Sequence, residues 1–414
     1  MQKKNAPPLR IGFVGSGFIA RFHLEAFLGV RDARISGVFS PTPAHREALA
    51  AEAGRLGLGP CAPFPSIESM LRSGEVDAVW LLGPNSTRLA NMRAIHREVK
   101  AGRATLRGVA CEKPLARNLA EAREMLRLAE DANLNHGYLE NQLFSTAVRR
   151  GREIIWRRAA PIAGRPYLAR ASEEHSGPHA PWFWRGEEQG GGVLSDMMCH
   201  SVEVARYLLT EPGRDRHSLR PLSASATIAT LKWGRREYAR RLEETIGVDY
   251  SSRPAEDFAR GTLALEDEAG NRLIIEATTS WSYVGPGLRI QLELLGPEYA
   301  MEYSTLNSGL KVFLSRNVSG EAGEDLVEKQ NAEQGLMPVL EDEAASYGYT
   351  LEDRHMVGCF LRGERPEETF RDGVAVVELL MALYRSAETG RTIALPDPEL
   401  EDYVPAVARG EYRG

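Results

Sequence analysis

Short apolar runs alternate with amphipathic stretches through the first third of the chain. The apolar runs predict strands at residues 9–14, 34–39, 78–82, 108–111 and 135–139. Helices fill the gaps, and the clearest covers residues 119–132, where Asn118 and Glu121 make a capping-box-like start. Strands that alternate with helices predict a parallel sheet covered on both faces. We therefore expect an α/β Rossmann domain, a doubly wound parallel sheet, over residues 1–145.

Beyond residue 145, long strands follow one another with few helices between them. Turn signals such as Gly270-Asn271 separate the strands predicted at 166–171, 222–231, 259–266, 273–279, 290–295 and 311–314. Two helices near 342–361 and 371–389 close the chain, and one of them could pack back on the first domain. The charged or polar stretches 234–256 and 320–334 are expected on the surface. Residues 146–414 thus predict a C-terminal α+β domain with a large open, mostly antiparallel sheet.

The first predicted strand ends in a glycine turn that reads Gly-x-Gly-x-x-Ala. Its residues Gly15, Ser16, Gly17, Phe18 and Ile19 are the predicted cofactor-binding turn. In a βαβ unit Gly15 permits the tight turn, and Gly17 lets a pyrophosphate approach the backbone. The helix that follows offers N–H groups and a positive dipole end to the phosphates. A glycine-rich turn without a ligand is the alternative, and the flanking strand and helix favour dinucleotide binding.

The residues after the second strand bear on the choice of nicotinamide cofactor. That strand ends at Ser40-Pro41-Thr42, without the Asp or Glu that holds a ribose 2′-hydroxyl. His45 and Arg46 could face a 2′-phosphate, although solvated positions on a helix explain them equally well. We expect NAD, with NADP as the alternative, and Ser40 and Thr42 among its contacts.

Lys113 follows the strand at 108–111 within Glu112-Lys113-Pro114. The carboxyl edge of the sheet is where ligands bind in doubly wound folds. Proline biases the preceding residue away from helical geometry, so Lys113 ends the strand and can point over the sheet edge. Considered alone, a lysine in a loop is usually only solvated.

Asp196 and His200 stand four residues apart on a predicted helix that follows three consecutive glycines, 190–192. That spacing puts a carboxylate and an imidazole on one helix face, within reach of a single bound molecule. The glycines would let the backbone come close to a ligand or to a neighbouring loop. Such a pair is more often an ordinary surface pair, so its interpretation depends on the other motifs.

The glycine turn, Glu112-Lys113-Pro114, and Gly191-Gly192 with Asp196 and His200 together resemble the Gfo/Idh/MocA oxidoreductase family. The order and spacing of three separate motifs are more specific than any one of them. The resemblance implies an NAD(P)-dependent enzyme in which Lys113, Asp196 and His200 line the nicotinamide site. It also implies that His200 carries the proton.

Further segments extend this resemblance, and two depart from it. The loop at 82–85 is similar to a cofactor-contacting loop of the family, and Trp184-Arg185 precedes the glycines. Arg88 stands where a histidine is often found, and residues 140–144 replace an Asn-x-Arg-Phe pattern. The resemblance implies cofactor contacts at Leu82, Pro84, Asn85, Glu112, Lys113, Asn141, Trp184 and Arg185.

The loop at 173–185 is unusually aromatic and contains two histidines. Aromatic faces pack against the C–H faces of sugar rings, which favours a sugar, glycoside or cyclitol as the substrate. A hydrophobic plug between domains is the alternative. The predicted substrate-binding residues are Lys113, His175, His179, Trp182, Asp196 and His200. His175 and His179 could hold a metal ion with His200 or Glu173 completing the site, but the spacing fixes no third ligand, so no metal is predicted.

These residues predict hydride transfer between a secondary alcohol and the nicotinamide. His200 would remove the hydroxyl proton, Lys113 would stabilise the developing alkoxide and could share the proton transfer, and Asp196 would orient His200 or bind a hydroxyl. The Tyr-x-x-x-Lys pair of short-chain dehydrogenases does not occur in the sequence. Two alternatives stay open: a non-catalytic NAD(P)-binding regulatory protein, and an enzyme that recycles tightly bound NAD in a net non-redox reaction.

Composition narrows the setting of this chemistry. A formal net charge of -6 argues against a nucleic-acid partner, because phosphate contacts need clustered Lys and Arg. The arginine-rich run at 149–158 surrounds a predicted helix and includes Glu153, which favours a solvated face. The four cysteines form no C-x-x-C pair, and neither a signal peptide nor a membrane span is visible. We expect a cytoplasmic protein, and an open sheet face that needs covering predicts a homodimer or homotetramer.

Overall fold

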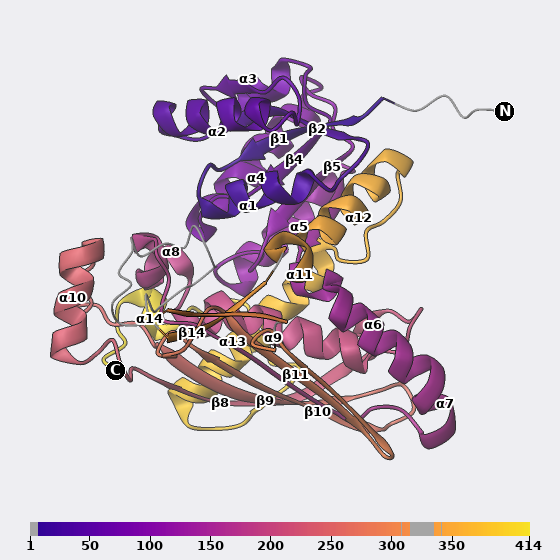
Figure 1. Cartoon of the computed structure of the whole chain (residues 1–414), viewed down its shortest axis with the longest axis vertical. Helices are drawn as coiled ribbons and strands as arrows, with labels where there is room; N and C mark the ends of the chain where they lie inside the picture. The colour runs from indigo at the N-terminus through magenta and orange to yellow at the C-terminus, as the bar shows by residue number, and fades with distance from the viewer. Residues whose placement is uncertain (1–6, 308, 315–334, 341) are drawn as a thin grey trace. The chain divides into compact units, whose positions relative to one another are not determined.

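The computed structural model describes residues 7–307, 309–314, 335–340 and 342–414, so the predicted surface stretch at 320–334 lies outside it. The chain forms two compact units (Figure 1). The first unit comprises Met1–Ala116, Ala120–Ser145 and Tyr347–Ala375. The second comprises Arg117–Leu119, Thr146–Ser346 and Val376–Gly414. Residues 347–375 thus cluster with the first unit; the predicted boundary at residue 145 allowed a C-terminal helix to pack back on the first domain.

The first unit is built on a six-stranded parallel sheet in the order β3-β2-β1-β4-β5-β6. This is the strand order of dinucleotide-binding doubly wound folds, and it confirms the predicted Rossmann class. The strands are β1 (Leu9–Val14), β2 (Ala33–Phe39), β3 (Ala62–Phe64), β4 (Ala78–Leu81), β5 (Gly108–Glu112) and β6 (Asn135–Leu139). The helices between them are α1 (Phe18–Phe27), α2 (Pro43–Arg55), α3 (Ile67–Arg72), α4 (Asn85–Lys100) and α5 (Leu119–Asp131). A 3-10 turn, Asn141–Phe144, follows β6.

A helix from late in the chain completes the core of the first unit. Met356 and Phe360 of α12 (Tyr349–Arg362) are buried in one apolar cluster with Ile11, Phe13 and Trp80. The single helix predicted at 342–361 is therefore wrong in detail, because α11 (Glu343–Ser346) and α12 are separate. The break falls where Gly348 packs directly on the backbone at Asn141.

The second unit contains a seven-stranded sheet in the order β12-β11-β7-β10-β9-β8-β15. Only β7 and β10 are parallel, so the predicted open, mostly antiparallel sheet is confirmed. The strands are β7 (Leu168–Glu174), β8 (Arg220–Ala229), β9 (Phe258–Glu266), β10 (Arg272–Ser280), β11 (Arg289–Gly296), β12 (Tyr299–Ser304) and β15 (Ile393–Ala394). The helices are α6 (Thr146–Ile154), α7 (Ala160–Ala163), α8 (Gly186–Gln189), α9 (Val193–Leu209), α10 (Arg236–Ile246) and α14 (Ala406–Arg409), together with most of α13 (Phe370–Thr389).

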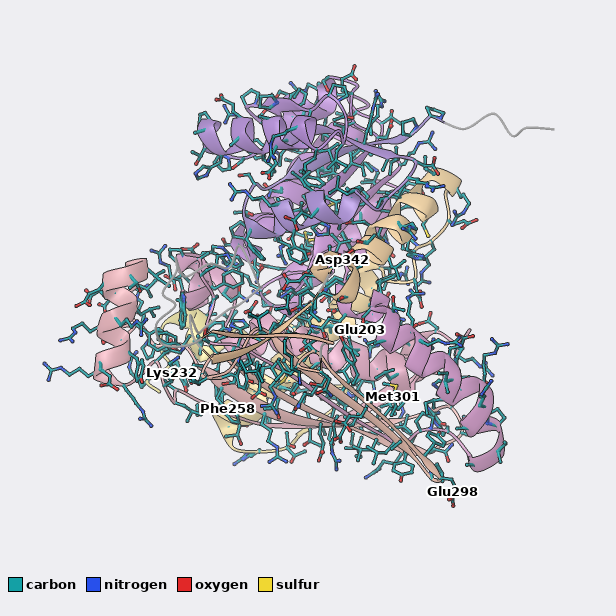
Figure 2. All side chains as sticks on the ribbon, in the orientation of Figure 1. Glu203, Lys232, Phe258, Glu298, Met301 and Asp342 are labelled. Atoms are coloured by element: carbon teal, nitrogen blue, oxygen red, sulfur yellow. The ribbon has the colours of Figure 1, made fainter. Side chains whose placement is uncertain are left out.

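One face of this sheet is buried and the other is partly exposed. Side chains alternate between buried and half-buried along β9, β10 and β11, as period-two strands require. Helix α9 packs against β7 and β10, and α13 approaches β9 where Leu383 contacts Gly261 (Figure 1). On the other face, Arg170 of β7 forms ion pairs with Glu276 and Glu293 of the adjacent strands. Figure 2 labels Lys232 and Glu298 at opposite ends of the sheet.

Three sequence-based expectations need correction in this unit. The strand predicted at 311–314 does not join the large sheet, because β13 (Leu310–Leu314) pairs with β14 (Gly335–Val339) alone. The edge strands β12 and β15 were not predicted, since their partly exposed residues give little apolar pattern. The stretch 234–256 is not all surface, because Tyr250 and Glu256 at its end are buried.

Candidate active site

The glycine turn between β1 and α1 is shaped by backbone packing. Gly15 adopts a φ of +126°, and a Cβ there would lie 2.7 Å from the backbone of Leu82 and Gly83. Only glycine fits such a turn without strain. Gly17 differs, because a Cβ built on it meets none of the described atoms within 4 Å. Among the described residues, α1 has no side-chain cap and no acidic residue in its first turn. The turn therefore leaves room and N–H groups for an anion at the start of α1.

The other predicted cofactor residues of the first unit follow the carboxyl ends of neighbouring strands. Leu82 and Asn85 are buried after β4, with Pro84 between them as the N-cap of α4. Ser40 is buried after β2, and Thr42 is the exposed N-cap of α2. These positions share the sheet edge of the glycine turn, since all strands are parallel.

Arg46 reaches back to the loop after β2. Its Nη1 donates to the carbonyl oxygens of Ser40 at 3.1 Å and Pro41 at 3.3 Å. The guanidinium thus stands beside the segment that meets the adenosine ribose in dinucleotide-binding folds. A positive charge in this place suits a 2′-phosphate.

Lys113 is held in a braced turn at the end of β5. Its backbone N–H donates to Glu112 Oε2 at 3.0 Å. Arg88, which is buried, donates from Nη1 to the carbonyl oxygens of Glu112, at 2.7 Å, and Pro114. Its Nε donates to Gly83 O at 3.2 Å. The arginine that departs from the family pattern therefore ties the Lys113 turn to the loop after β4, a role that sequence reasoning missed because no local signal reports it.

Asn141 lies in the 3-10 turn after β6 and is buried. Its Nδ2 donates to the carbonyl oxygen of Tyr347 at 2.9 Å, which anchors the segment leading into α12. Its predicted contact with the cofactor stays a prediction beside this structural role.

The three glycines before α9 serve close packing within the second unit. A Cβ on Gly191 would lie 2.0 Å from Tyr384 Oη, and one on Gly192 would lie 2.5 Å from Glu256. Of the two predicted reasons for these glycines, a ligand or a neighbouring element, the structure supplies the second. Glu256 Oε1 accepts hydrogen bonds from the N–H groups of Gly192 and Leu194, both at 3.0 Å. Tyr384 Oη accepts from Ser195 N at 3.1 Å and donates to Glu256 Oε1 at 2.5 Å.

The helix α9 is buried along its whole length, including two of the three predicted catalytic residues, Asp196 and His200. Asp196 is 4% exposed and His200 is 3% exposed, so the ordinary surface pair is excluded. Asp196 Oδ2 accepts a hydrogen bond from Trp281 Nε1 at 3.2 Å. The tryptophan orients the carboxylate at the first turn of α9, one turn before His200.

The C-terminal half of α9 carries a buried ion-pair group. Glu203, labelled in Figure 2, pairs with Arg206 at 2.5 Å and with Arg216 at 2.7 Å. Arg152 donates to the carbonyl oxygens of Tyr207 and Thr210 and so caps the helix. The arginine-rich run at 149–158 is therefore not wholly a solvated face. Its other members Arg150 and Arg157 are exposed and pair with Glu153, as predicted.

Burial changes the acidity of the group that caps α9. It raises the pKa of the Glu256 carboxyl to about 7, although hydrogen bonds from Tyr384 and from backbone N–H groups act in the opposite direction. Tyr384 has its hydroxyl pKa raised by the same burial and by the neighbouring Glu256 carboxylate. The cap thus carries its charge only in the neutral and alkaline range.

The predicted substrate loop is held by an aromatic cluster. Trp184 is 1% exposed, donates from Nε1 to Pro178 O at 2.9 Å, and packs 5.0 Å from the rings of Trp233 and Trp281. The side chain of Trp184 is therefore part of the core, whereas Arg185 beside it is exposed. The predicted cofactor contacts of these two residues stay predictions.

The remaining loop residues differ in exposure. His175 is buried and its Nδ1 accepts a hydrogen bond from Gly177 N at 2.9 Å. Trp182 is half-buried and stacks on Phe183 with ring centroids 3.7 Å apart, while His179 is half-buried 6.4 Å from Phe183. Trp182 and His179 thus offer partly accessible rings to a ligand. Lys113 belongs to the first unit, and Asp196, His200 and this loop belong to the second.

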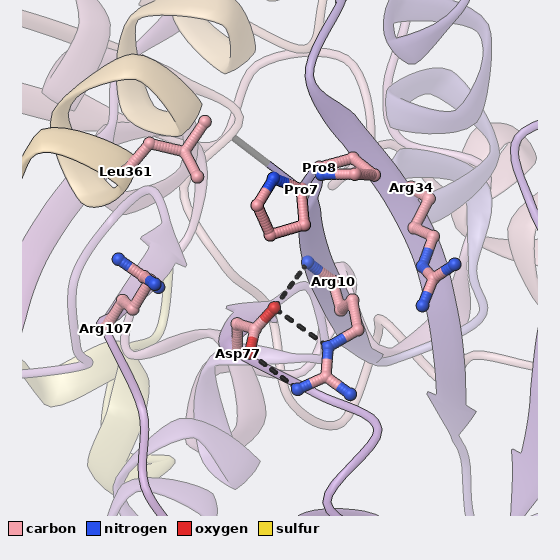
Figure 3. Close-up of a pocket in the computed structure, with 7 residues that line it drawn as sticks. All are labelled: Pro7, Pro8, Arg10, Arg34, Asp77, Arg107 and Leu361. Atoms are coloured by element: carbon pink, nitrogen blue, oxygen red, sulfur yellow. Dashed lines mark hydrogen bonds and ion pairs between the residues drawn. The ribbon is translucent and has the colours of Figure 1, made fainter. Parts of the chain in front are cut away.

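A pocket of about 350 Å³ lies at the other edge of the first sheet. Its lining includes Arg10, Arg34, Asp77 and Arg107, at or just before the amino ends of β1, β2, β4 and β5. Figure 3 shows Arg34 and Arg107 on opposite sides of the Arg10–Asp77 ion pair. The glycine turn and Lys113 follow the carboxyl ends of these strands, so this pocket is not the predicted active site.

Comparison with protein families accounts for most of the chain. Residues 9–137 match the model described as "Oxidoreductase family, NAD-binding Rossmann fold". Residues 164–395 match the model described as "Oxidoreductase family, C-terminal alpha/beta domain". In the described part of the chain, no helix combines the length and the apolar character that a bilayer crossing needs.

Individual relatives agree with the family match. An inositol 2-dehydrogenase of Rhizobium meliloti (strain 1021) is 24% identical over 392 residues, which cover 94% of this chain and 99% of the relative. A 1,5-anhydro-D-fructose reductase of Ensifer adhaerens is 32% identical over 209 residues, covering 49% and 57%. Among solved structures, GenD2 from gentamicin A biosynthesis in complex with NAD has a TM-score of 0.75 at 22% identity and covers 95% of this chain and 98% of that chain. The last likeness establishes the fold.

Proposed function

The chain belongs to the Gfo/Idh/MocA oxidoreductase family, and from this premise we propose that it oxidises a secondary alcohol of a sugar, glycoside or cyclitol with NAD as the hydride acceptor. The observation that carries the proposal is that the two units hold different parts of the predicted site. The first unit has an uncapped glycine turn and a braced Lys113, and the second has a buried Asp196–His200 face.

The residues present fit the cofactor. Gly15 to Ile19 would hold the pyrophosphate at the start of α1, where no described atom lies within 4 Å of a Cβ built on Gly17. Ser40, Thr42 and the loop from Leu82 to Asn85 would flank the adenosine and nicotinamide halves. When bound, the cofactor supplies an electrophilic carbon that accepts the hydride from the carbinol carbon.

The protein's own groups would handle the proton and the developing charge. His200 would take the hydroxyl proton, because an imidazole is a base near neutral pH. The Lys113 ammonium would donate a hydrogen bond to the same oxygen as negative charge develops on it. Asp196, fixed by Trp281, would keep the His200 ring oriented or bind a neighbouring hydroxyl. Loss of the alcohol C–H as hydride and of the O–H proton to His200 leaves a ketone.

The side chains of the loop at 173–185 support the proposed substrate class. Trp182 and His179 offer an apolar ring face and a polar tip, which match the C–H face and hydroxyls of a pyranose or cyclitol. Relatives named for inositol and for 1,5-anhydro-D-fructose support a polyol ring. We also propose a cytoplasmic location. The protein would form a homodimer or homotetramer whose contacts cover the Arg170 face of the sheet. Light scattering that gives a monomer would contradict this oligomeric state.

A substrate panel tests the reaction. Inositols, glucosides and anhydrosugars are assayed with NAD+ and NADP+ by absorbance at the nicotinamide wavelength. We expect one NADH released per ketone formed. A net reaction without NADH release, with nucleotide recovered from the denatured protein, would support a recycled cofactor. Nucleotide binding without turnover of any polyol would support a regulatory protein.

Arg46 provides a matched test of cofactor choice. If its guanidinium binds a 2′-phosphate, Arg46→Ala lowers kcat/KM for NADP+ about tenfold and leaves that for NAD+ unchanged. Arg55→Ala, at an exposed position on the same helix, is the control. Equal effects on the two cofactors would remove Arg46 from the choice.

A further inference from the structure

His23 lies on α1, one and a half turns after the glycine turn, and is completely buried. Its Nε2 lies 3.1 Å from Glu112 Oε1, and its Nδ1 lies 2.9 Å from Asp353 Oδ2. Glu112 ends β5 beside Lys113, and Asp353 belongs to α12. One imidazole therefore joins three elements that are far apart in the sequence.

We propose that His23 is a positioning residue for Lys113: its ring ties the phosphate-binding helix α1 to the Glu112–Lys113 turn and to Asp353. The chain of contacts is continuous. Glu112 Oε1 faces His23, while Glu112 Oε2 accepts the backbone N–H of Lys113 at 3.0 Å. A movement of α1 is therefore transmitted to Lys113 through one carboxylate. The catalytic consequence rests on the proposed role of Lys113, whereas the link itself does not.

The geometry is that of a charged ring between two ionised carboxylates. Both ring nitrogens face a carboxylate oxygen at hydrogen-bond distance, and an ionised carboxylate only accepts. Both nitrogens must then carry hydrogen. Burial alone lowers the pKa of His23, but the Asp353 and Glu112 carboxylates outweigh it and raise it to about 10. For the Glu112 carboxyl, burial acts in the opposite direction and raises the pKa. The neighbouring His23, Lys113 and Arg88 outweigh this and bring the pKa of Glu112 below its usual range.

The other groups around the ring support this charge state. Trp80 Nε1 donates to Asp353 Oδ1 at 3.0 Å, so both oxygens of that carboxylate are engaged. Glu352, next to Asp353, is completely buried, and its carboxyl pKa is raised well above the usual value by burial and by Asp353, Glu112, Glu140 and Glu368. Burial and these neighbouring carboxylates therefore favour the uncharged form of Glu352. Phe13 and Tyr349 contact the ring edge-on and add no charge.

The same atoms define a competing interpretation. His23, Glu352 and Asp353 each offer a ligand atom within 4.8 Å of the others, a spacing that a metal ion could also use. A metal would require a neutral ring, because the ligating nitrogen must have lost its proton. The protonation state of His23 separates the two.

Nuclear magnetic resonance of 15N-histidine in the full-length protein tests the charge without any substrate. We expect one of the nine imidazoles to keep both nitrogens protonated up to about pH 9. His23→Gln should remove that signal, and if this variant does not fold, Glu112→Gln should shift it. A set of histidines that all lose a proton below pH 8 overturns the proposal. So does a divalent metal that raises Tm of the chelator-treated protein and abolishes the protonated signal.

Kinetics test the positioning role. His23→Gln leaves the negative charge of Glu112 without its positive partner beside Lys113, which should raise the pKa of the Lys113 ammonium. The limb of the pH profile that belongs to Lys113 is identified as the one that disappears in Lys113→Met. We expect His23→Gln to shift this limb to higher pH by about one unit. We expect kcat to fall about tenfold, with KM for the polyol changed less than twofold. The double variant His23→Gln/Glu112→Gln removes the uncompensated charge and should return the limb to its original pH.

The control is His96→Gln, which breaks a partly exposed histidine pair with Asp131 in the same unit and should change neither kcat nor the limb. An unchanged pH profile in His23→Gln, with only Tm lowered, would show a purely structural role and overturn the proposal. A protein that oxidises no polyol but shows the protonated imidazole contradicts the proposed function and leaves the link standing.

Discussion

Helices α1 and α9 both begin directly after glycines, and they begin in opposite ways. Among the described residues, the N-terminus of α1 has no side-chain cap, and no atom lies within 4 Å of a Cβ built on Gly17. The N-terminus of α9 is filled by Glu256 and Tyr384, which engage the N–H groups of residues 192, 194 and 195. The backbone N–H groups at the start of α1 are thus not engaged by a side-chain cap, whereas those at the start of α9 are engaged by groups of the protein. A glycine run therefore does not identify an anion site until its neighbours are known.

The largest effect should come from a side chain of α9. His200→Asn removes the proposed base and should lower kcat by about a hundredfold to ten-thousandfold, or about 3–5 kcal/mol. NADH affinity should stay the same, because binding depends on the α1 turn. Steady-state kinetics and calorimetric titration measure the two. A similar loss of NADH affinity would contradict the assignment of cofactor binding to α1 and of proton transfer to α9.

Second in size is the pH response of the α9 cap. Burial raises the pKa of Glu256 from 4.5 to about 7, so this group stabilises the fold most below pH 4.5 and progressively less as pH rises through 7. We expect Glu256→Gln to remove a pH-dependent term on the order of 3 kcal/mol. Urea unfolding of both proteins at pH 5 and pH 8 measures it. If the difference between the two proteins is the same at both pH values, the cap does not titrate.

The third prediction adds a methyl group to each glycine of the first turn. The methyl of Gly17→Ala meets no atom of the described residues within 4 Å, so Tm should not change. NADH affinity should fall about 10- to 100-fold, or 1–3 kcal/mol, because the methyl occupies the approach of the pyrophosphate. Gly15→Ala is the matched variant, and it should lower Tm because its Cβ would meet backbone at 2.7 Å. Unchanged NADH affinity in Gly17→Ala would argue against phosphates at this turn.

The smallest effect concerns a single hydroxyl. Tyr384→Phe leaves the N–H of Ser195 without its acceptor and should cost about 1–2 kcal/mol of unfolding free energy. NADH affinity should not change. Tyr299→Phe, which loses one exposed hydrogen bond to Gly164, is the control and should cost less. Equal losses in the two variants would mean that the cap contributes nothing specific.

The sequence predicted features that depend on neighbouring residues. Five of the six Rossmann strands, the glycine turn and the Lys113 position follow from local pattern, because period and turn chemistry act over a few residues, whereas the three-residue edge strand β3 was not predicted. The spacing of Asp196 and His200 placed them correctly on one helix, since four residues complete about one turn.

Contacts between distant segments could not be predicted from one sequence. Glu256 and Tyr384 reach α9 from 62 and 189 positions away, and His23 meets Asp353 across 330 positions. Glu256 lies in a charged stretch that composition alone assigns to the surface. The edge strands escaped for a related reason, because their half-exposed residues carry no distinctive period.

Trp80 provides a fluorescence signal for the Glu112–His23–Asp353 group of the first unit. It is the one tryptophan of that unit, and its indole bonds to the Asp353 carboxylate that holds His23. The other five tryptophans belong to the second unit. Replacing those five tryptophans by phenylalanine would leave Trp80 as the single fluorescent tryptophan. Its emission wavelength would then report when the Asp353 carboxylate beside the indole loses its negative charge.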